Sequence, residues 1–220
     1  MEKHIEAAQL IQEGKLEEAA KLLNEAIQEN PTNTIAYVNF GHLLSIIGEK
    51  ERAITFYQKA IEIDETMATA YYGAGNTYFE QEKYEEAIGM FKEAIANGLV
   101  EADAYFMLGL SYSSIGILPY ALANFCTATE KNPTDVDAMF QYGLTLAQLE
   151  QVDEAITVLE KVVNLDETHA DAYYNLGVAY TFKEDGEKAM ACFDQALKIQ
   201  PGHLLAGNGK KQLEAFLKGE

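Results

Sequence analysis

Apolar side chains recur along this chain at the i, i+3 and i+4 spacing that places them on one face of a helix. Thr69 to Gln81 is one such segment and Glu85 to Asn97 is the next, with a short polar stretch between them. No segment alternates apolar and polar residues as a half-buried strand would. The pattern therefore predicts an all-α protein built from pairs of short helices.

The helix pairs recur with a period of 34 residues, and no insertion or deletion interrupts it. Small residues mark the period at fixed positions, which are Gly41, Gly75, Gly109, Gly143 and Gly177, and Ala19, Ala53, Ala87, Ala121, Ala155 and Ala189. Small residues let two helices approach to about 8 Å. We therefore expect Gly75 and Ala87 to bring one pair together, with larger residues such as Phe91 filling the layer between pairs.

The period sets the expected boundaries of the repeats. They are residues 1–33, 34–67, 68–101, 102–135, 136–169 and 170–203, followed by a helix at about 204–217, all in a single domain covering 1–220. Pro31, Pro133 and Pro201 share one position between repeats, where a helix must end. Asn97-Gly98 is a helix C-terminal signal, and Pro119 suits the first turn of a helix.

One repeat carries a recognisable set of residues. In the sixth, the set is Tyr173, Leu176, Gly177, Tyr180, Ala189, Phe193 and Pro201. This set resembles the tetratricopeptide repeat, with Tyr in place of the usual Trp. The resemblance implies a right-handed α-solenoid of six tandem helix-turn-helix repeats with a C-terminal capping helix. The first repeat departs from the set, as suits a terminal repeat, and Gly207 and Gly209 predict that the capping helix frays.

The resemblance also implies where ligands bind, because tetratricopeptide proteins usually hold peptides in a concave groove lined by their first helices. The expected peptide-binding residues are Val38, His42, Tyr72, Asn76, Phe79, Asp103, Phe106, Leu110, Asp137, Phe140, Leu144, Asp171, Tyr174 and Val178. None of the groove positions carries Lys or Arg. An apolar, aromatic floor with an acidic edge favours segments that combine apolar side chains with basic ones.

Other interpretations of the same residues stay open at this point. The aromatic side chains could pack on neighbouring helices, and the aspartates could stabilise helix N-termini. A second functional class is self-assembly through the groove or the capping helix, which carries Leu204, Leu205, Leu213, Phe216 and Leu217. Recognition of carboxylate termini fits poorly, because the cations that such tetratricopeptide domains use are missing from the groove positions.

The charge balance narrows the partners. The chain has 16 Lys and Arg against 35 Asp and Glu, for a formal net charge of -19. Such a body repels nucleic acid and anionic membranes. The two cysteines and four histidines lack metal-site spacing, and no catalytic motif occurs. We expect a cytoplasmic protein without cofactor, metal or enzymatic activity, with no further catalytic domain, that acts as an adaptor for other proteins, with assembly into a homo-oligomer as the alternative.

Overall fold

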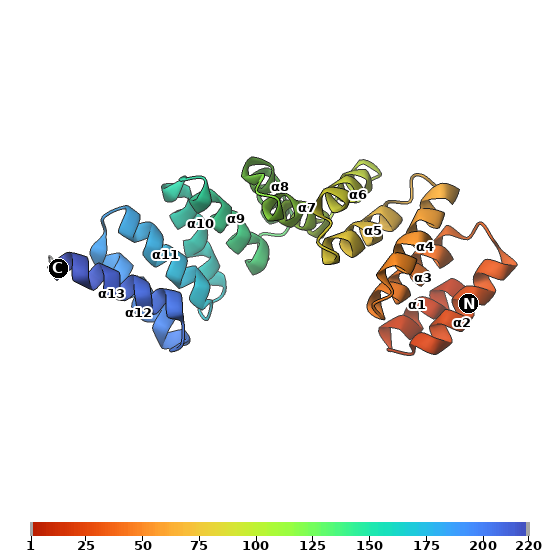
Figure 1. The fold of residues 1–220 in the computed structure, drawn as a ribbon, viewed down its shortest axis with the longest axis horizontal. Coiled ribbons are helices and arrows are strands. Elements are labelled where there is room, and N and C mark those ends of the chain that lie inside the picture. The colour runs from red at the N-terminus through yellow and green to blue at the C-terminus, as the bar shows by residue number, and fades with distance from the viewer. Residues whose placement is uncertain (1, 219–220) are drawn as a thin grey trace. The chain divides into compact units, whose positions relative to one another are not determined.

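The computed structural model describes residues 2–218, which form thirteen α-helices and no strand. The helices are α1 (Lys3–Gln12), α2 (Leu16–Glu29), α3 (Thr34–Ile46), α4 (Lys50–Ile63), α5 (Ala68–Glu80), α6 (Tyr84–Ala96), α7 (Ala102–Ser114), α8 (Leu118–Lys131), α9 (Val136–Gln148), α10 (Val152–Leu165), α11 (Ala170–Phe182), α12 (Gly186–Ile199) and α13 (Leu204–Lys218). Each expected repeat contains two helices (Figure 1), and the all-α fold built from tandem helix pairs is confirmed.

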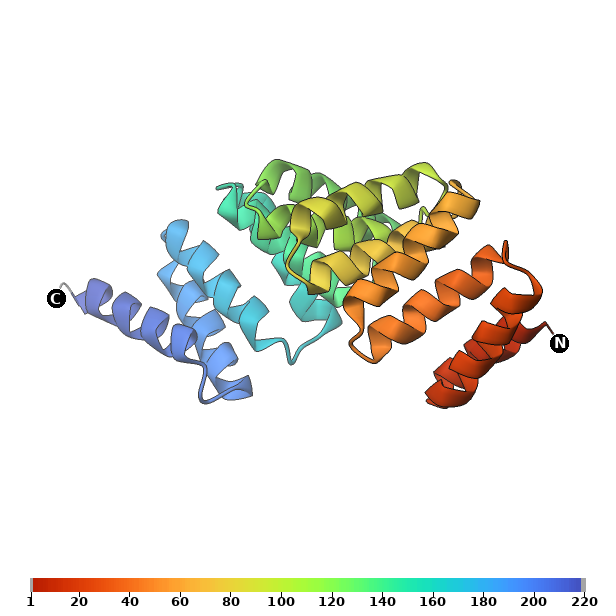
Figure 2. The ribbon, with the colours of Figure 1, turned by 45° about the vertical axis from the view of Figure 1, so that its right-hand side comes forward.

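The chain divides into two compact units, residues 1–116 and 117–220. The boundary falls between α7 and α8, inside the expected fourth repeat, and the expectation of a single domain stays a prediction. Within each unit, each helix packs on the next one along the chain, as Figures 1 and 2 show for α3 to α6. First helices of adjacent repeats also contact one another, as α3 does with α5 and α11 with α13. In both units the first helices therefore form the closely spaced layer.

The regular spacing of glycines has a specific steric cause. A Cβ on Gly75 would lie 2.7 Å from the Phe91 ring, and one on Gly177 would lie 2.6 Å from the Phe193 ring. Gly41 faces Tyr57 in the same way. The sequence predicted that small residues let the two helices of a pair approach. In these three pairs, the glycine does so by making room for an aromatic ring of the partner helix. Phe91 fills its own hairpin as well as contacting the following repeat.

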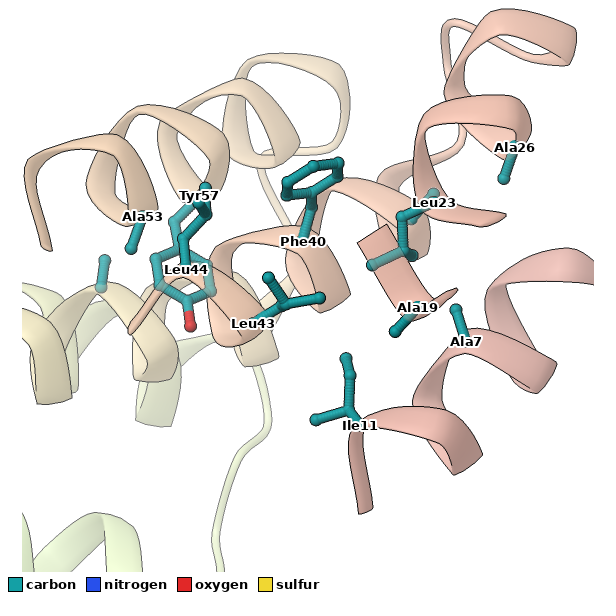
Figure 3. Packing of buried hydrophobic residues seen from close by; sticks show 12 residues of the cluster. Ala7, Ile11, Ala19, Leu23, Ala26, Phe40, Leu43, Leu44, Ala53 and Tyr57 are labelled. Carbon is teal, nitrogen blue, oxygen red and sulfur yellow. The ribbon is translucent and has the colours of Figure 1, made fainter. Parts of the chain in front are cut away.

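The first core cluster illustrates this packing (Figure 3). Phe40, Leu43 and Leu44 of α3 meet Tyr57 of α4 and Leu23 of α2, and all are at most 5% exposed. Alanines at the repeat positions, such as Ala19 and Ala53, are fully buried between the helices. Burial of this apolar surface is the main force that holds successive hairpins together.

Loops between repeats are closed by a recurring side-chain turn. Asn30 accepts hydrogen bonds from the backbone N–H and the hydroxyl of Thr32 at 3.1 and 2.9 Å. Asp166 and Thr168 repeat the arrangement, and these bonds lower the pKa of Asp166. This turn explains why two loops tolerate Glu, at Glu65 and Glu167, where Pro stands in other repeats, because the side chains hold the bend.

The tips of the hairpins require a left-handed backbone. Gly14, Gly48 and Gly116 adopt φ between 74° and 81° there. Glu82, Glu150 and Glu184 occupy the same position in other repeats, with φ near 60°. A residue with a Cβ is strained in this region, so these three hairpins are held by their packing. Gly98 likewise has φ +100° after α6, as expected from the sequence.

The last helix keeps the phase of the repeat. Ala206 of α13 is fully buried, and Lys210 binds Asp194 of α12 at 2.6 Å. Gly209 was expected only to weaken this helix, but a Cβ there would lie 2.9 Å from the Phe193 ring. Gly209 therefore serves packing between α12 and α13, in addition to its cost in helix propensity.

Candidate functional site

A recess opens between α3 and α5 in the first unit, and we call it the Gly73 recess. It has a volume of about 390 Å³. Its lining residues are Val38, Asn39, His42, Ser45, Ile46, Tyr57, Thr69, Tyr72, Gly73, Asn76 and Glu80. Four of the expected peptide-binding residues, Val38, His42, Tyr72 and Asn76, thus lie around one concavity. No Lys or Arg belongs to this lining in the described part of the chain.

The recess exists because one side chain is missing. Gly73 sits on the Tyr57 ring, and a Cβ on Gly73 would lie 2.5 Å from that ring. The same repeat position holds Asn39, Met107, Gln141 and Asn175 in other first helices. Each of those side chains adds bulk where Gly73 adds none. Glycine at this position therefore lets α5 approach the Tyr57 ring of α4 and leaves open space beside it.

Hydrogen-bonding groups surround this space. The amide oxygen Oδ1 of Asn76 is buried and has no partner among the described residues. The Tyr57 ring reaches the recess from α4, and Figure 3 shows its hydroxyl at the end far from that helix. Burial raises the pKa of Tyr57, so the phenol stays neutral and can both donate and accept. Lys50 binds the Glu80 carboxylate at 3.2 Å at the rim.

Tyr72 borders both this recess and the core of its own repeat. Burial raises the pKa of its phenol, the Asn76 amide opposes part of that rise, and the Asp103 carboxylate adds to it. The Tyr72 ring packs against Phe91, with 5.7 Å between ring centroids. Tyr72 therefore contributes one part of its surface to the core and another to the recess.

A second recess lies between α11 and α13 in the second unit, and we call it the Gly209 recess. It has a volume of about 780 Å³. Its lining residues are Val178, Thr181, Phe182, Glu184, Gly186, Phe193, Gly209, Gln212, Leu213, Phe216 and Leu217. Phe182 and Phe216 are 74% and 79% exposed, which is exceptional for large apolar side chains. This recess is predominantly apolar.

The remaining expected site residues lie on the same first-helix layer but outside both recesses. Phe79 packs edge-on against Tyr84, with 5.3 Å between centroids. Phe140 packs against His169 at 4.4 Å, and Tyr174 against His203 at 5.4 Å. The other members are the exposed Asp103, Asp137 and Asp171 in the first turns of their helices, and the half-buried Phe106, Leu110 and Leu144.

Two histidines act as helix caps, a role that was not expected from the sequence. The Nδ1 atoms of His169 and His203 accept the backbone N–H of Ala172 and Ala206 at 3.2 and 3.1 Å. Because Nδ1 of His203 accepts, the ring hydrogen sits on Nε2 and is donated to Asp171 Oδ1 at 3.0 Å. Asp171 is thus engaged within the protein. Asn33 and Asp135 cap α3 and α9 at the same repeat position. This shared position is the feature of the sequence from which the capping role of the two histidines could have been predicted.

No group of three or more His, Cys, Asp or Glu side chains in residues 2–218 is arranged to hold a metal ion. Cys126 and Cys192 are free thiols, and burial raises the pKa of Cys192 to about 11. No helix between residues 2 and 218 has the length and apolar character needed to cross a membrane.

Comparison with known families identifies the class of protein. Models described as "Tetratricopeptide repeat" match residues 72–122, 127–157 and 170–203, and one described as "TPR repeat" matches 41–81 and 143–181. A comparison with curated proteins produced no match. Together with the structural comparisons below, these matches show that the chain belongs to the tetratricopeptide-repeat family.

Solved structures agree with this assignment. The crystal structure of YrrB, described as a TPR protein with an unusual peptide-binding site, is 44% identical with a TM-score of 0.84, over 87% of this chain and 99% of YrrB. MamA is 26% identical with a TM-score of 0.72, over 76% of this chain and 92% of MamA. PilF of Pseudomonas aeruginosa, at 20% identity, shares the fold with a TM-score of 0.79, over 96% of this chain and 98% of PilF.

Proposed function

We propose that this chain is a non-catalytic adaptor that binds peptide segments of other proteins along the first-helix layer of its units. The segments combine apolar side chains with Lys or Arg. Family membership supports protein interaction as the general role. YrrB, the relative at 44% identity, is described as having a peptide-binding site.

The lining of the Gly73 recess is the main support for this function. Val38, His42, Tyr72 and Asn76 come from two different repeats and line a single concavity. A concavity with aromatic surface and a few fixed polar groups is the usual form of a ligand site. The charge agrees, because the chain carries a net charge of -19 and its groove positions include no Lys or Arg. Opposite charge in a ligand speeds and orients association.

Peptide selection from a random library on the purified chain tests this function. We expect the selected peptides to contain aliphatic or aromatic residues next to Lys or Arg, and their affinity to fall as salt increases. Selection of acidic peptides, or of none, would contradict the proposal. Affinity that is insensitive to ionic strength would remove the electrostatic part.

Recess variants locate the binding face. Tyr72→Ala with Asn76→Leu addresses the first unit, and Val178→Ser with Phe182→Ser addresses the second. These are preferable to Phe140→Ala, because Phe140 packs against His169 and its removal would disturb the stacking of repeats. Calorimetry should show weaker binding of a selected peptide in at least one pair, with helical content unchanged by circular dichroism. Full affinity in both pairs would exclude the two recesses as binding sites.

Self-association is a second candidate, favoured by the exposed apolar surface of α13. Leu204, Phe216 and Leu217 are 81%, 79% and 61% exposed, and such patches commonly mark interaction surfaces. Sedimentation of the wild type and of Phe216→Ser with Leu217→Ser distinguishes the candidates. A wild-type oligomer that the variant converts to monomer supports self-association, whereas a wild-type monomer at micromolar concentration excludes it.

A further inference from the structure

We propose that the Gly73 recess is a subsite for an arginine side chain of the bound segment. This inference rests on the proposed function and gives one recess a defined ligand chemistry. The recess offers hydrogen-bond acceptors, aromatic surface and one carboxylate, and its lining holds no cation.

One acceptor of the recess is unpaired. Asn76 Oδ1 is buried in this lining without a hydrogen-bond partner among the described residues. An unpaired buried acceptor is unfavourable relative to a paired one. A ligand N–H that reached Oδ1, after a rotation of the amide that gives up its interaction with the Tyr72 phenol, would remove this deficit. Leu110 and Leu144 hold the same position in later repeats, so packing alone does not require an amide there.

Tyr57 adds a second acceptor, independently of Asn76. The equivalent residue is Phe91, Phe125 or Phe193 in three other repeats and Leu23 or Leu159 in the remaining two, so packing needs an apolar side chain there and the hydroxyl is an addition. That oxygen would lie 2.9 Å from a Cβ on Gly73, at the place where other first helices carry a side chain. Gly73 therefore leaves a phenol oxygen next to the open space, and any larger residue would displace it.

Electrostatics and shape select arginine among donors. Glu80 is the charged member of the lining, and Lys50 at 3.2 Å shares its carboxylate at the rim. A guanidinium carries five N–H donors in a plane and stacks on aromatic rings. The half-buried Tyr72 supplies a ring, and Asn76, Tyr57 and Glu80 supply acceptors from two adjacent helices. A lysine ammonium is a compact point charge that cannot span acceptors spread in this way.

The subsite is distinct from the recess at the other glycine. The Gly209 recess has the phenyl ring of Phe193 where the Gly73 recess has a phenol, and Gln212 where it has Asn76. At the repeat positions of His42 and Glu80, the Gly209 recess has the apolar Val178 and Phe216. The same chain therefore contains an internal control that shares the glycine and an amide but lacks the phenol, the histidine and the carboxylate at the Glu80 position.

The test uses N-acetyl-arginine amide as the probe, with nitrogen-15 spectra of the full chain. We expect saturable shifts at the Asn76 side-chain amide and at the Thr69 and Tyr72 backbone amides, and none around Gly209. The isosteric but uncharged N-acetyl-citrulline amide should bind at least tenfold more weakly, and N-acetyl-lysine amide severalfold more weakly. Equal shifts with citrulline amide, or equally strong shifts over the whole acidic surface with lysine amide, would overturn the proposal.

Two variants that use residues found elsewhere in the chain assign the contacts. Tyr57→Phe removes only the hydroxyl, and Asn76→Leu introduces the residue of the fourth and fifth repeats. Each should weaken the arginine probe by about threefold to tenfold with an unchanged helical spectrum, and unchanged affinity in both would overturn the subsite. If the arginine probe fails while selected peptides still bind this face and lose affinity in Tyr72→Ala, the subsite falls and the proposed function stands.

Discussion

The two recesses arise from one steric device and differ in chemistry. Gly73 lies against the Tyr57 ring and Gly209 against the Phe193 ring, each at the same position of a first helix. The Gly73 recess has Asn76, His42 and Glu80 around it, whereas the Gly209 recess has Phe182, Phe216 and Leu213. A repeat protein can therefore place concavities by omitting a side chain and then give each concavity its own specificity.

The recesses also differ in what their rims present to solvent. The floor rings Tyr57 and Phe193 are 3% and 2% exposed, whereas the rim has the exposed Glu80 at the first recess and Phe216, 79% exposed, at the same repeat position of the second. The first recess therefore has a partly polar rim, and the second an apolar one. A ligand gains orientation from fixed polar groups and affinity from buried apolar area, so we expect the two to contribute differently to binding.

The largest effect should come from adding one carbon to the floor of the first recess. Gly73→Ala places a Cβ about where the Tyr57 ring lies, and overpacking of this kind destabilises by about 1–3 kcal/mol. Gly89→Ala is the matched control, because Gly89 lies within α6 and a Cβ there would meet no atom within 4 Å. The Gly89→Ala substitution should stabilise the folded protein by about 0.5–1 kcal/mol. Urea unfolding followed by circular dichroism measures both, and loss of stability in both variants would contradict the steric account.

The apolar character of the second recess predicts dye binding. Nile red, an uncharged dye, should bind there, and Phe216→Ser should weaken that binding about tenfold, since burial of one large apolar side chain is worth about 1.5–3 kcal/mol. Asn76→Leu, in the other recess, should not reduce it. Fluorescence titration is the measurement. Dye binding that Phe216→Ser leaves intact would show that the apolar lining does not form a site.

We expect His203, which caps α13, to stabilise the helix that lines one side of the Gly209 recess. His203→Ala removes the acceptor for the Ala206 N–H and the bond to Asp171, and loss of a cap typically costs about 1 kcal/mol. His203→Asn should retain most of the stability, because Asn33 caps α3 in the same way. Hydrogen exchange of the Ala206 amide should accelerate only in the alanine variant. Equal exchange in both variants would mean that the side chain does not cap the helix.

The smallest effect concerns hairpin tips, where the two units should respond alike. Glu82→Gly and Glu150→Gly relieve a left-handed conformation that costs about 1–2 kcal/mol. On folding, glycine loses about 0.5–1 kcal/mol more conformational entropy than a residue with a side chain. Each variant should therefore be more stable than the wild type by about 0.5–1 kcal/mol. Gly48→Ala, at the equivalent tip, should lose stability. Thermal unfolding that shows no gain in either glutamate variant would contradict this account.

Much of the fold could be predicted because the repeat leaves little freedom. The two helices expected at 69–81 and 85–97 are observed one residue earlier, as α5 and α6, and Pro119 lies in the first turn of α8 as expected. The repeat positions predict fourteen site residues, and four of them gather around the Gly73 recess. Tyr57 and Gly73 were missed, because one belongs to a second helix and the other has no side chain.

The packing partners of the aromatic residues were the least predictable part. Phe140 and Tyr174 contact the capping histidines of the next repeats, and Phe79 contacts Tyr84. The periodic pattern gives the face on which a ring lies, but the same face borders both the neighbouring hairpin and the solvent. Which of these a ring meets depends on side-chain directions and on the residues 34 places away.

The sequence alone determined the all-α class, the family and the phase of every helix pair, because a 34-residue period repeats the same local signals of helix, turn and small residue. Tertiary structure decided where the layer of first helices opens. Whether Gly73 leaves a recess or only a closer contact depends on the Tyr57 ring of a different helix, and such a distance between side chains is set when the hairpins pack.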